Sequence, residues 1–244
     1  MQDFTNQRFD DANFSGARFR GVIFHQVAIS DALLIDVDIS GRVGGLRING
    51  VDVTAYVEEE LNRRHPARAK MSAPDPDSMR DAWDTIERFT TETSARAAAL
   101  PSGWVDESVD GEFSYAQTLR HLIYAIDRWI TGPVLEAADP FHPIGYPNTP
   151  HDDYVSAFVD LSLVPSFDEI LAVRRNRMDS VREVVASIDD AELDRSVVNP
   201  NGGTTTVRSC LHVVFGEEWA HDQYANRDLA VLEQRLGAAP GAGG

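Results

Sequence analysis

The sequence contains very little cysteine and no long apolar run. Cys210 is the single cysteine among 244 residues, which excludes a disulfide framework and fits a reducing compartment. No apolar stretch follows the first residues as it does in a signal peptide. Nowhere do 18 apolar residues run together, as a membrane-spanning helix requires. We therefore expect a cytoplasmic protein without a membrane partner.

Basic residues are scarce relative to acidic ones. Two common site motifs, a phosphate-binding loop and a hydrolase nucleophile motif, are missing. The 22 basic residues face 39 acidic ones, giving a net charge of −17 that repels phosphate and disfavours nucleic acid as a partner. Residues 1–65 hold ten acidic residues and seven arginines, so most of the negative charge lies beyond them. Residues 201–203, Asn-Gly-Gly, indicate a turn rather than a phosphate-binding loop, and no Gly-x-Ser-x-Gly motif marks a hydrolase nucleophile.

An internal repeat with a period of five covers residues 1–40. Large apolar residues recur at every fifth position: Phe4, Phe9, Phe14, Phe19, Phe24, Ile29, Leu34 and Ile39. Neither a helix nor a flat strand has this period, whereas a coil of square cross-section turns one corner every five residues. The pattern resembles the pentapeptide-repeat family, whose members form a right-handed quadrilateral β-helix. We assign residues 1–65 to this segment, including a hairpin around Asn49-Gly50 and a short helix through Arg64.

The rest of the chain is predicted to be helical, after a polar, proline-bearing linker at residues 66–77. Ser78 is expected to precede the first long helix, and two capping boxes, Ser114-x-x-Gln117 and Ser166-x-x-Glu169, open the second and third. The fourth is expected from about Thr206 to Leu232. Four amphipathic helices indicate a four-helix bundle over residues 75–236, followed by a disordered Gly/Ala-rich tail at 237–244. The predicted fold class is thus α+β, a short β-helix followed by a helical bundle.

The expected fourth helix contains the stretch that predicts metal binding. Glu217 and His221 are four residues apart, so both project from one face and can hold the same ion. Glu218 lies at the centre of the apolar stripe, where a carboxylate requires a partner or a metal. Since positions three apart also share a side, Glu218 is an alternative ligand to Glu217. His121 on the second helix is the candidate third ligand, with a solvated surface histidine as the alternative reading.

Residues 75–232 resemble the DinB-like superfamily of four-helix metal proteins. The resemblance rests on His121-Leu122, on Asp127 six residues after His121, and on Glu217-x-x-x-His221. The mycothiol-dependent maleylpyruvate isomerase group of that superfamily uses the same His, Glu and His. The resemblance therefore implies an open site in which His121, Glu217 and His221 hold zinc or a similar divalent ion.

Three further residues are candidates around this site. Glu218 and Asp222 are expected to orient the ligands. Arg128 shares the helix face of His121, and it either binds an anionic substrate carboxylate or forms a surface salt bridge.

The resemblance also implies a reaction class. Characterised members use a low-molecular-weight thiol, namely mycothiol, bacillithiol or glutathione, as the nucleophile. Lys70 is the only lysine, which suggests a GC-rich actinobacterial genome and favours mycothiol. We therefore expect a metal-dependent S-transferase or isomerase whose partners are a small thiol and an electrophile. The alternatives are a non-catalytic metal-binding stress protein and an interaction protein. The repeat segment is expected to serve in packing, capping or formation of a homodimer, with an independent binding module as the alternative.

Overall fold

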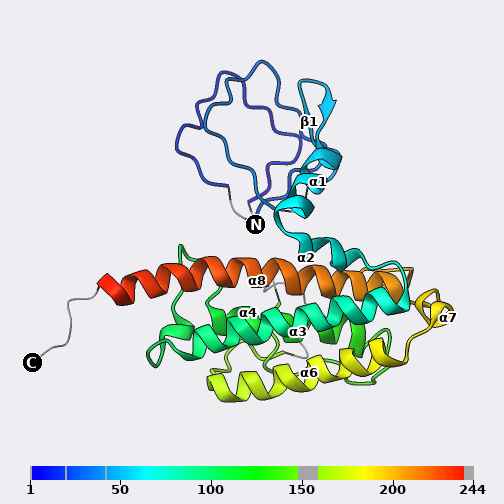
Figure 1. Cartoon of the computed structure of the whole chain (residues 1–244). Helices are drawn as coiled ribbons and strands as arrows, with labels where there is room; N and C mark the ends of the chain where they lie inside the picture. The colour runs from blue at the N-terminus through cyan, green and yellow to red at the C-terminus, as the bar shows by residue number, and fades with distance from the viewer. Residues whose placement is uncertain (1, 20, 42, 148–158, 239–244) are drawn as a thin grey trace, which may run out of the picture. The chain divides into compact units, whose positions relative to one another are not determined.

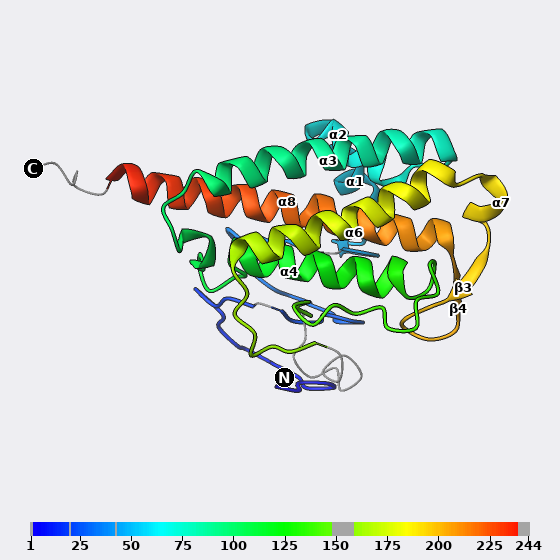
Figure 2. The same cartoon turned by 90° about the horizontal axis from the view of Figure 1, so that it is seen from below.

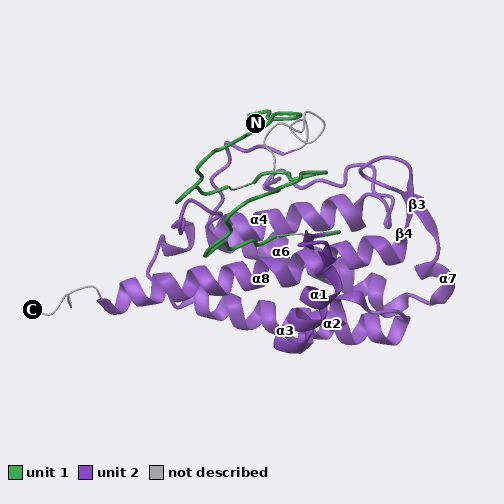
Figure 3. Cartoon of the chain, turned by 90° about the horizontal axis from the view of Figure 1, so that it is seen from above, with its two compact units in different colours: residues 1–45 green, residues 46–244 purple. Residues whose placement is uncertain are grey.

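The computed structural model describes residues 2–19, 21–41, 43–147 and 159–238. The chain divides into two compact units, a repeat unit at Met1–Gly45 and a helical unit at Leu46–Gly244 (Figure 3). This division lies before the hairpin, so residues 46–65 group with the helices and not with the repeat. Of the predicted disordered tail at 237–244, Gly237 and Ala238 instead end a helix, and the other residues lie outside the described part of the chain.

The repeat unit turns at every fifth residue, as its sequence period predicts. A positive φ recurs at eight positions: Asn6, Asp11, Gly16, Gly21, Gln26, Asp31, Asp36 and Gly41. The rings of Phe4, Phe9, Phe14, Phe19 and Phe24 follow one another at centroid distances between 5.7 and 6.0 Å. No strand is assigned to the described residues of this unit, so the β-helix stays a prediction.

The helical unit is built around four long helices, as predicted. They are α3 (Pro76–Ala98), α4 (Tyr115–Ile126), α6 (Phe167–Ser187) and α8 (Val207–Ala238) (Figures 1 and 2). Before them lie β1 (Arg47–Ile48), β2 (Val51–Asp52), α1 (Thr54–Arg64), α2 (Pro66–Ala69) and the 3₁₀ turn η1 (Lys70–Ser72). A π-helical turn, η3 (Asp127–Thr131), continues α4. The other short elements among the described residues are η2 (Trp104–Asp106), α7 (Asp190–Leu193), and the antiparallel pair β3 (Ser196–Val198) and β4 (Thr204–Thr206).

The core lies between the four helices and is closely packed. Trp83 of α3 stacks on Phe215 of α8 with ring centroids 5.7 Å apart, and both side chains are fully buried. Ile126 of α4 and Val185 of α6 complete this part of the core. None of the described helices is sufficiently long and apolar to cross a membrane.

Both predicted capping boxes are confirmed, and two predicted boundaries are wrong. The Ser114 and Ser166 side chains accept the N3 backbone N–H groups of α4 and α6. The first long helix starts at Pro76 and not after Ser78, because Asp75 accepts the Ser78 N–H at 2.9 Å. The expected linker at 66–77 contains α2 and η1, and Met71 within it is buried in the core. At the other end, α8 continues past the expected Leu232 to Ala238.

Candidate metal centre

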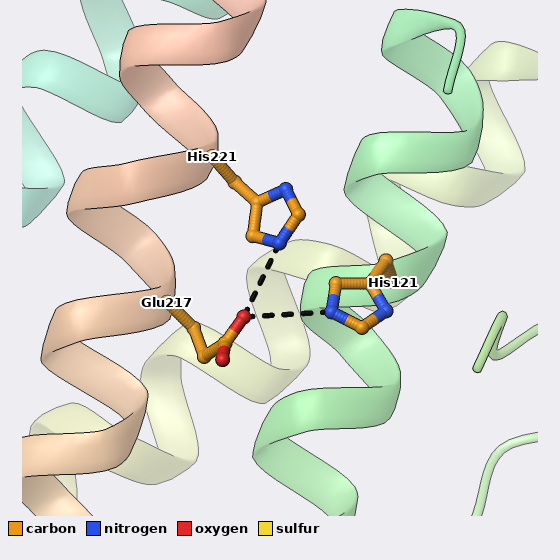
Figure 4. Close-up of side chains that lie close together, drawn as sticks. All are labelled: His121, Glu217 and His221. Atoms are coloured by element: carbon orange, nitrogen blue, oxygen red, sulfur yellow. Dashed lines mark ion pairs between the residues drawn. The ribbon is translucent and has the colours of Figure 1, made fainter. Parts of the chain in front are cut away.

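Helices α4 and α8 bring His121, Glu217 and His221 together near the middle of the bundle. One Glu217 carboxylate oxygen, Oε2, lies 3.5 Å from His121 Nε2 and 3.2 Å from His221 Nε2 (Figure 4). One ligand atom from each of the three residues lies within 4.8 Å of the others. Since Glu217 and His221 are one turn apart on α8, that helix supplies two donors to one point and α4 supplies the third.

The three side chains differ in exposure. The His121 side chain is 4% exposed, that of His221 is 14% exposed, and that of Glu217 is 35% exposed. His121 is therefore buried beside Glu217 and is not a solvated surface histidine. The centre is enclosed on the side of His121 and reaches solvent on the side of Glu217.

The electrostatics of the cluster suit a cation. Burial by itself raises the pKa of Glu217, but the nearby His121 and His221 side chains lower it to about 2. Glu217 is therefore an anion at neutral pH. His121 Nε2 is fully buried and has no hydrogen-bond partner, although it points toward this carboxylate. Two imidazole nitrogens and one carboxylate oxygen form a ligand set that zinc accepts in open sites, so these residues fit a divalent ion.

Comparison with known families agrees with this geometry. The family model described as DinB superfamily matches residues 53–225, which is well over half of the chain. The chain belongs to the DinB superfamily. Pentapeptide repeats match residues 3–40 in eight copies, which confirms the period-five repeat. No curated protein and no solved structure is significantly similar to the chain.

Glu218 of the DinB domain does not join the histidines. Its side chain is 1% exposed and forms an ion pair with Arg174 of α6, so the inward direction predicted from the helical wheel is confirmed. Burial raises the pKa of Glu218, and Arg174 opposes that shift. The sequence left open whether Glu217 or Glu218 is the acidic ligand. Of the two, Glu217 lies beside His121 and His221.

The hydrogen bonds described for Asp222 and Arg128 likewise go to residues other than the two histidines. The Thr93 hydroxyl donates to Asp222 Oδ1 at 2.5 Å, and Asn226 donates to Oδ2 at 3.0 Å. Burial raises the pKa of Asp222 to about 6, against these hydrogen bonds, which lower it. Arg128 donates to the Tyr124 hydroxyl at 3.0 Å and to Asn201 Oδ1 at 2.9 Å.

The group that does contact a candidate ligand was not anticipated from the sequence. His121 Nδ1 lies 2.9 Å from the backbone carbonyl oxygen of Tyr146. A main-chain carbonyl has no sequence signature, so no motif pointed to it. The neighbouring aromatic rings are Phe113, 5.9 Å from the His121 ring, Tyr124, 6.1 Å from it, and Tyr224, 5.8 Å from the His221 ring.

Proposed function

We propose that the DinB domain is a zinc-dependent enzyme that uses a low-molecular-weight thiol, mycothiol, in an S-transfer or isomerisation reaction. The observation that carries the proposal is the convergence of His121, Glu217 and His221 within 4.8 Å. Membership of the DinB superfamily, in which metal binding is common, supports the same assignment.

The side chains around the centre suit an open catalytic site. The His121, Glu217 and His221 side chains would supply three donors, which leaves one position of a tetrahedral ion for an exogenous ligand. Zinc bound there would supply a thiolate at neutral pH by lowering the pKa of a thiol. Because Glu217 is the most exposed of the three residues, small molecules approach from its side.

The chain's own residues would position the reactants. The rings of Tyr124 and Tyr224 border the two histidines, and Tyr224, which is 41% exposed, offers apolar surface to the carbon skeleton of a substrate. Arg128 lies seven residues after His121 and holds the Tyr124 hydroxyl, which keeps a positive charge beside this wall. We assign Arg128 to an anionic group of the electrophile.

Metal analysis of the purified full chain tests the site. We expect about one zinc ion per parent chain and less than about a tenth of that in His121→Ala and His221→Ala. His212→Ala is the matched control, because His212 lies on the same helix and bonds the Ala73 carbonyl at 2.8 Å, away from the centre. Equal zinc in the parent and the two ligand variants would disprove the assignment.

A thermal shift measurement with a panel of thiols tests the reaction class. Because a ligand that binds only the folded state raises the unfolding temperature, we expect stabilisation by mycothiol in the zinc-loaded parent and none in His121→Ala. Zinc binding without a response to mycothiol, bacillithiol or glutathione would instead favour a non-catalytic metal-binding protein.

A further inference from the structure

A short loop segment wraps α4 beside the candidate metal centre. We call residues 141–146 the strap. The Tyr146 N–H donates to the Arg120 carbonyl at 3.1 Å, and Arg120 Nε donates to the Ile144 carbonyl at 2.7 Å. The Arg120 guanidinium also lies 5.1 Å from the Tyr146 ring centroid. Arg120 is buried and immediately precedes His121, so one residue of α4 fixes the C-terminal end of the strap next to the histidine.

A second anchor holds the other end of the strap. Asp127 Oδ2 accepts the His142 N–H at 2.8 Å. The Asp127 side chain is fully buried, and Arg177 of α6 holds its other oxygen at 2.5 Å. The two anchors, Arg120 and Asp127, therefore stand on either side of His121 along the chain. A buried carboxylate with two sets of partners is a rigid attachment point.

The strap is also tightly packed at Gly145. A Cβ atom built on Gly145 would meet Val159 Cγ1 at 3.2 Å, the His142 carbonyl at 3.2 Å and Tyr124 Cβ at 3.4 Å. Glycine at this position leaves room for the His142 carbonyl and Val159. A side chain at position 145 would press on both of them, so the strap would have to shift.

The strap delivers a hydrogen-bond acceptor to His121. The Tyr146 carbonyl oxygen, 2.9 Å from Nδ1, can only accept, so Nδ1 must carry the hydrogen of this bond. A neutral ring then has its lone pair on Nε2, which is the nitrogen that faces Glu217. We propose that the strap, held by Arg120 and Asp127, positions His121 and selects the tautomer that presents Nε2 to the centre. Asp127 and Arg120 are positioning residues in this arrangement.

The inference rests on the proposed metal site for its consequence, but its structural part can be measured without metal. Nitrogen NMR of the histidine side chains in metal-free protein, at about pH 9 where an ordinary imidazole is neutral, reports which ring nitrogen carries the hydrogen. We expect the Nδ1–H form of His121 in the parent. The Nε2–H form would overturn the inference whatever the metal does.

Substitution of Asp127 tests the anchor. Asp127→Ala removes the acceptor of the His142 N–H, so we expect mixed tautomers of His121 and zinc affinity weakened by about 10- to 100-fold. Asp127→Asn keeps one acceptor oxygen for the His142 N–H and gives up the Arg177 pair, so it should retain the tautomer and more of the zinc affinity than Asp127→Ala. Gly145→Ala displaces the strap without touching a buried charge, and should shift both readouts in the same direction as Asp127→Ala.

The control separates positioning from general loss of stability. Val185→Ala removes core methyl groups from α6, so it should destabilise the fold while leaving the tautomer and the zinc affinity unchanged. The inference would be overturned if Asp127→Ala kept the His121 tautomer and the zinc affinity of the parent. It would also be overturned if Val185→Ala lost zinc affinity to the same extent. A parent that shows the Nδ1–H form yet binds no zinc would refute the proposed function and leave the strap's role standing.

Discussion

The repeat unit and the helical unit differ most in what they bury. The eight large apolar side chains of the repeat series stay between 51% and 71% exposed, although they follow a strict period of five. In the helical unit, the large side chains of Trp83 and Phe215 are fully buried. A strict sequence repeat therefore does not show how much apolar surface a unit buries. Eight pentapeptide steps are too few to enclose their own interior, as expected when stacked units depend on their neighbours.

The charge of the chain follows the same division. The repeat unit carries six acidic and four basic residues, so nearly all of the net charge of −17 lies in the helical unit. Some of that charge is inside the bundle, because Glu218 and Asp127 are buried and each is held by an arginine of α6. Only the helical unit has a closed interior in which carboxyl groups can be buried beside arginines. The same unit holds the candidate metal centre.

Breaking the buried ion pair should have the largest effect on stability. Arg174→Met leaves the Glu218 carboxyl group unpaired in the interior, so we expect a loss of about 3–5 kcal/mol in the free energy of unfolding. In the repeat unit, Arg8→Met removes an exposed pair with Asp10 and should cost less than about 1 kcal/mol. Urea unfolding of the metal-free protein gives both values.

The double variant Arg174→Met/Glu218→Leu is the control for this prediction. Because it leaves no buried charge unpaired, it should recover most of the loss. A single variant as stable as the parent would mean that the pair is not buried in solution, and the contrast between the units would weaken.

Truncating an apolar side chain should have the next largest effect on the free energy of unfolding, and only in the helical unit. Leu229 is 1% exposed and Leu34 is 61% exposed. We expect Leu229→Ala to cost about 2–5 kcal/mol and Leu34→Ala less than about 1 kcal/mol. Cys210 gives a readout confined to the helical unit, because the thiol is buried and burial raises its pKa to about 11.

A thiol reagent should therefore modify Cys210 only when the helical unit unfolds. Leu229→Ala should accelerate this modification under mild denaturant, whereas Leu34→Ala should leave the rate unchanged. If both variants accelerated it equally, the stability of the helical unit would depend on the repeat unit, in line with a capping role.

The sequence predicted those features of the helical unit that depend on short separations. The capping boxes at Ser114 and Ser166 and the pairing of Glu217 with His221 involve residues three or four apart, where helix geometry is fixed. Arg174, the partner of Glu218, lies 44 residues away, and the Tyr146 carbonyl 25 residues from His121. Such partners depend on how helices and loops pack, which local patterns do not encode.

The repeat unit shows the opposite case, because a local sequence signal marks each of its corners. Its positive φ values fall two residues after each large apolar residue, at positions occupied by Gly, Asn, Asp or Gln. Gly, Asn and Asp tolerate the left-handed conformation best, so the corners could have been located from the sequence.

The smallest predicted effect comes from substitution by glycine, which should stabilise the repeat unit and destabilise the helical unit. Gln26 has a φ of 55°, which strains a residue with a Cβ atom, so Gln26→Gly should stabilise its corner by up to about 1 kcal/mol. Ala172 lies on the exposed face of α6, where glycine should cost about 1 kcal/mol. Hydrogen exchange of the amides around each position measures both changes in the same spectrum. Slower exchange around residue 26 together with faster exchange around residue 172 would show that the repeat unit is shaped by its corners and the bundle by its helices. Faster exchange at both positions would contradict the left-handed corner at Gln26, and with it the period-five turning of the repeat unit.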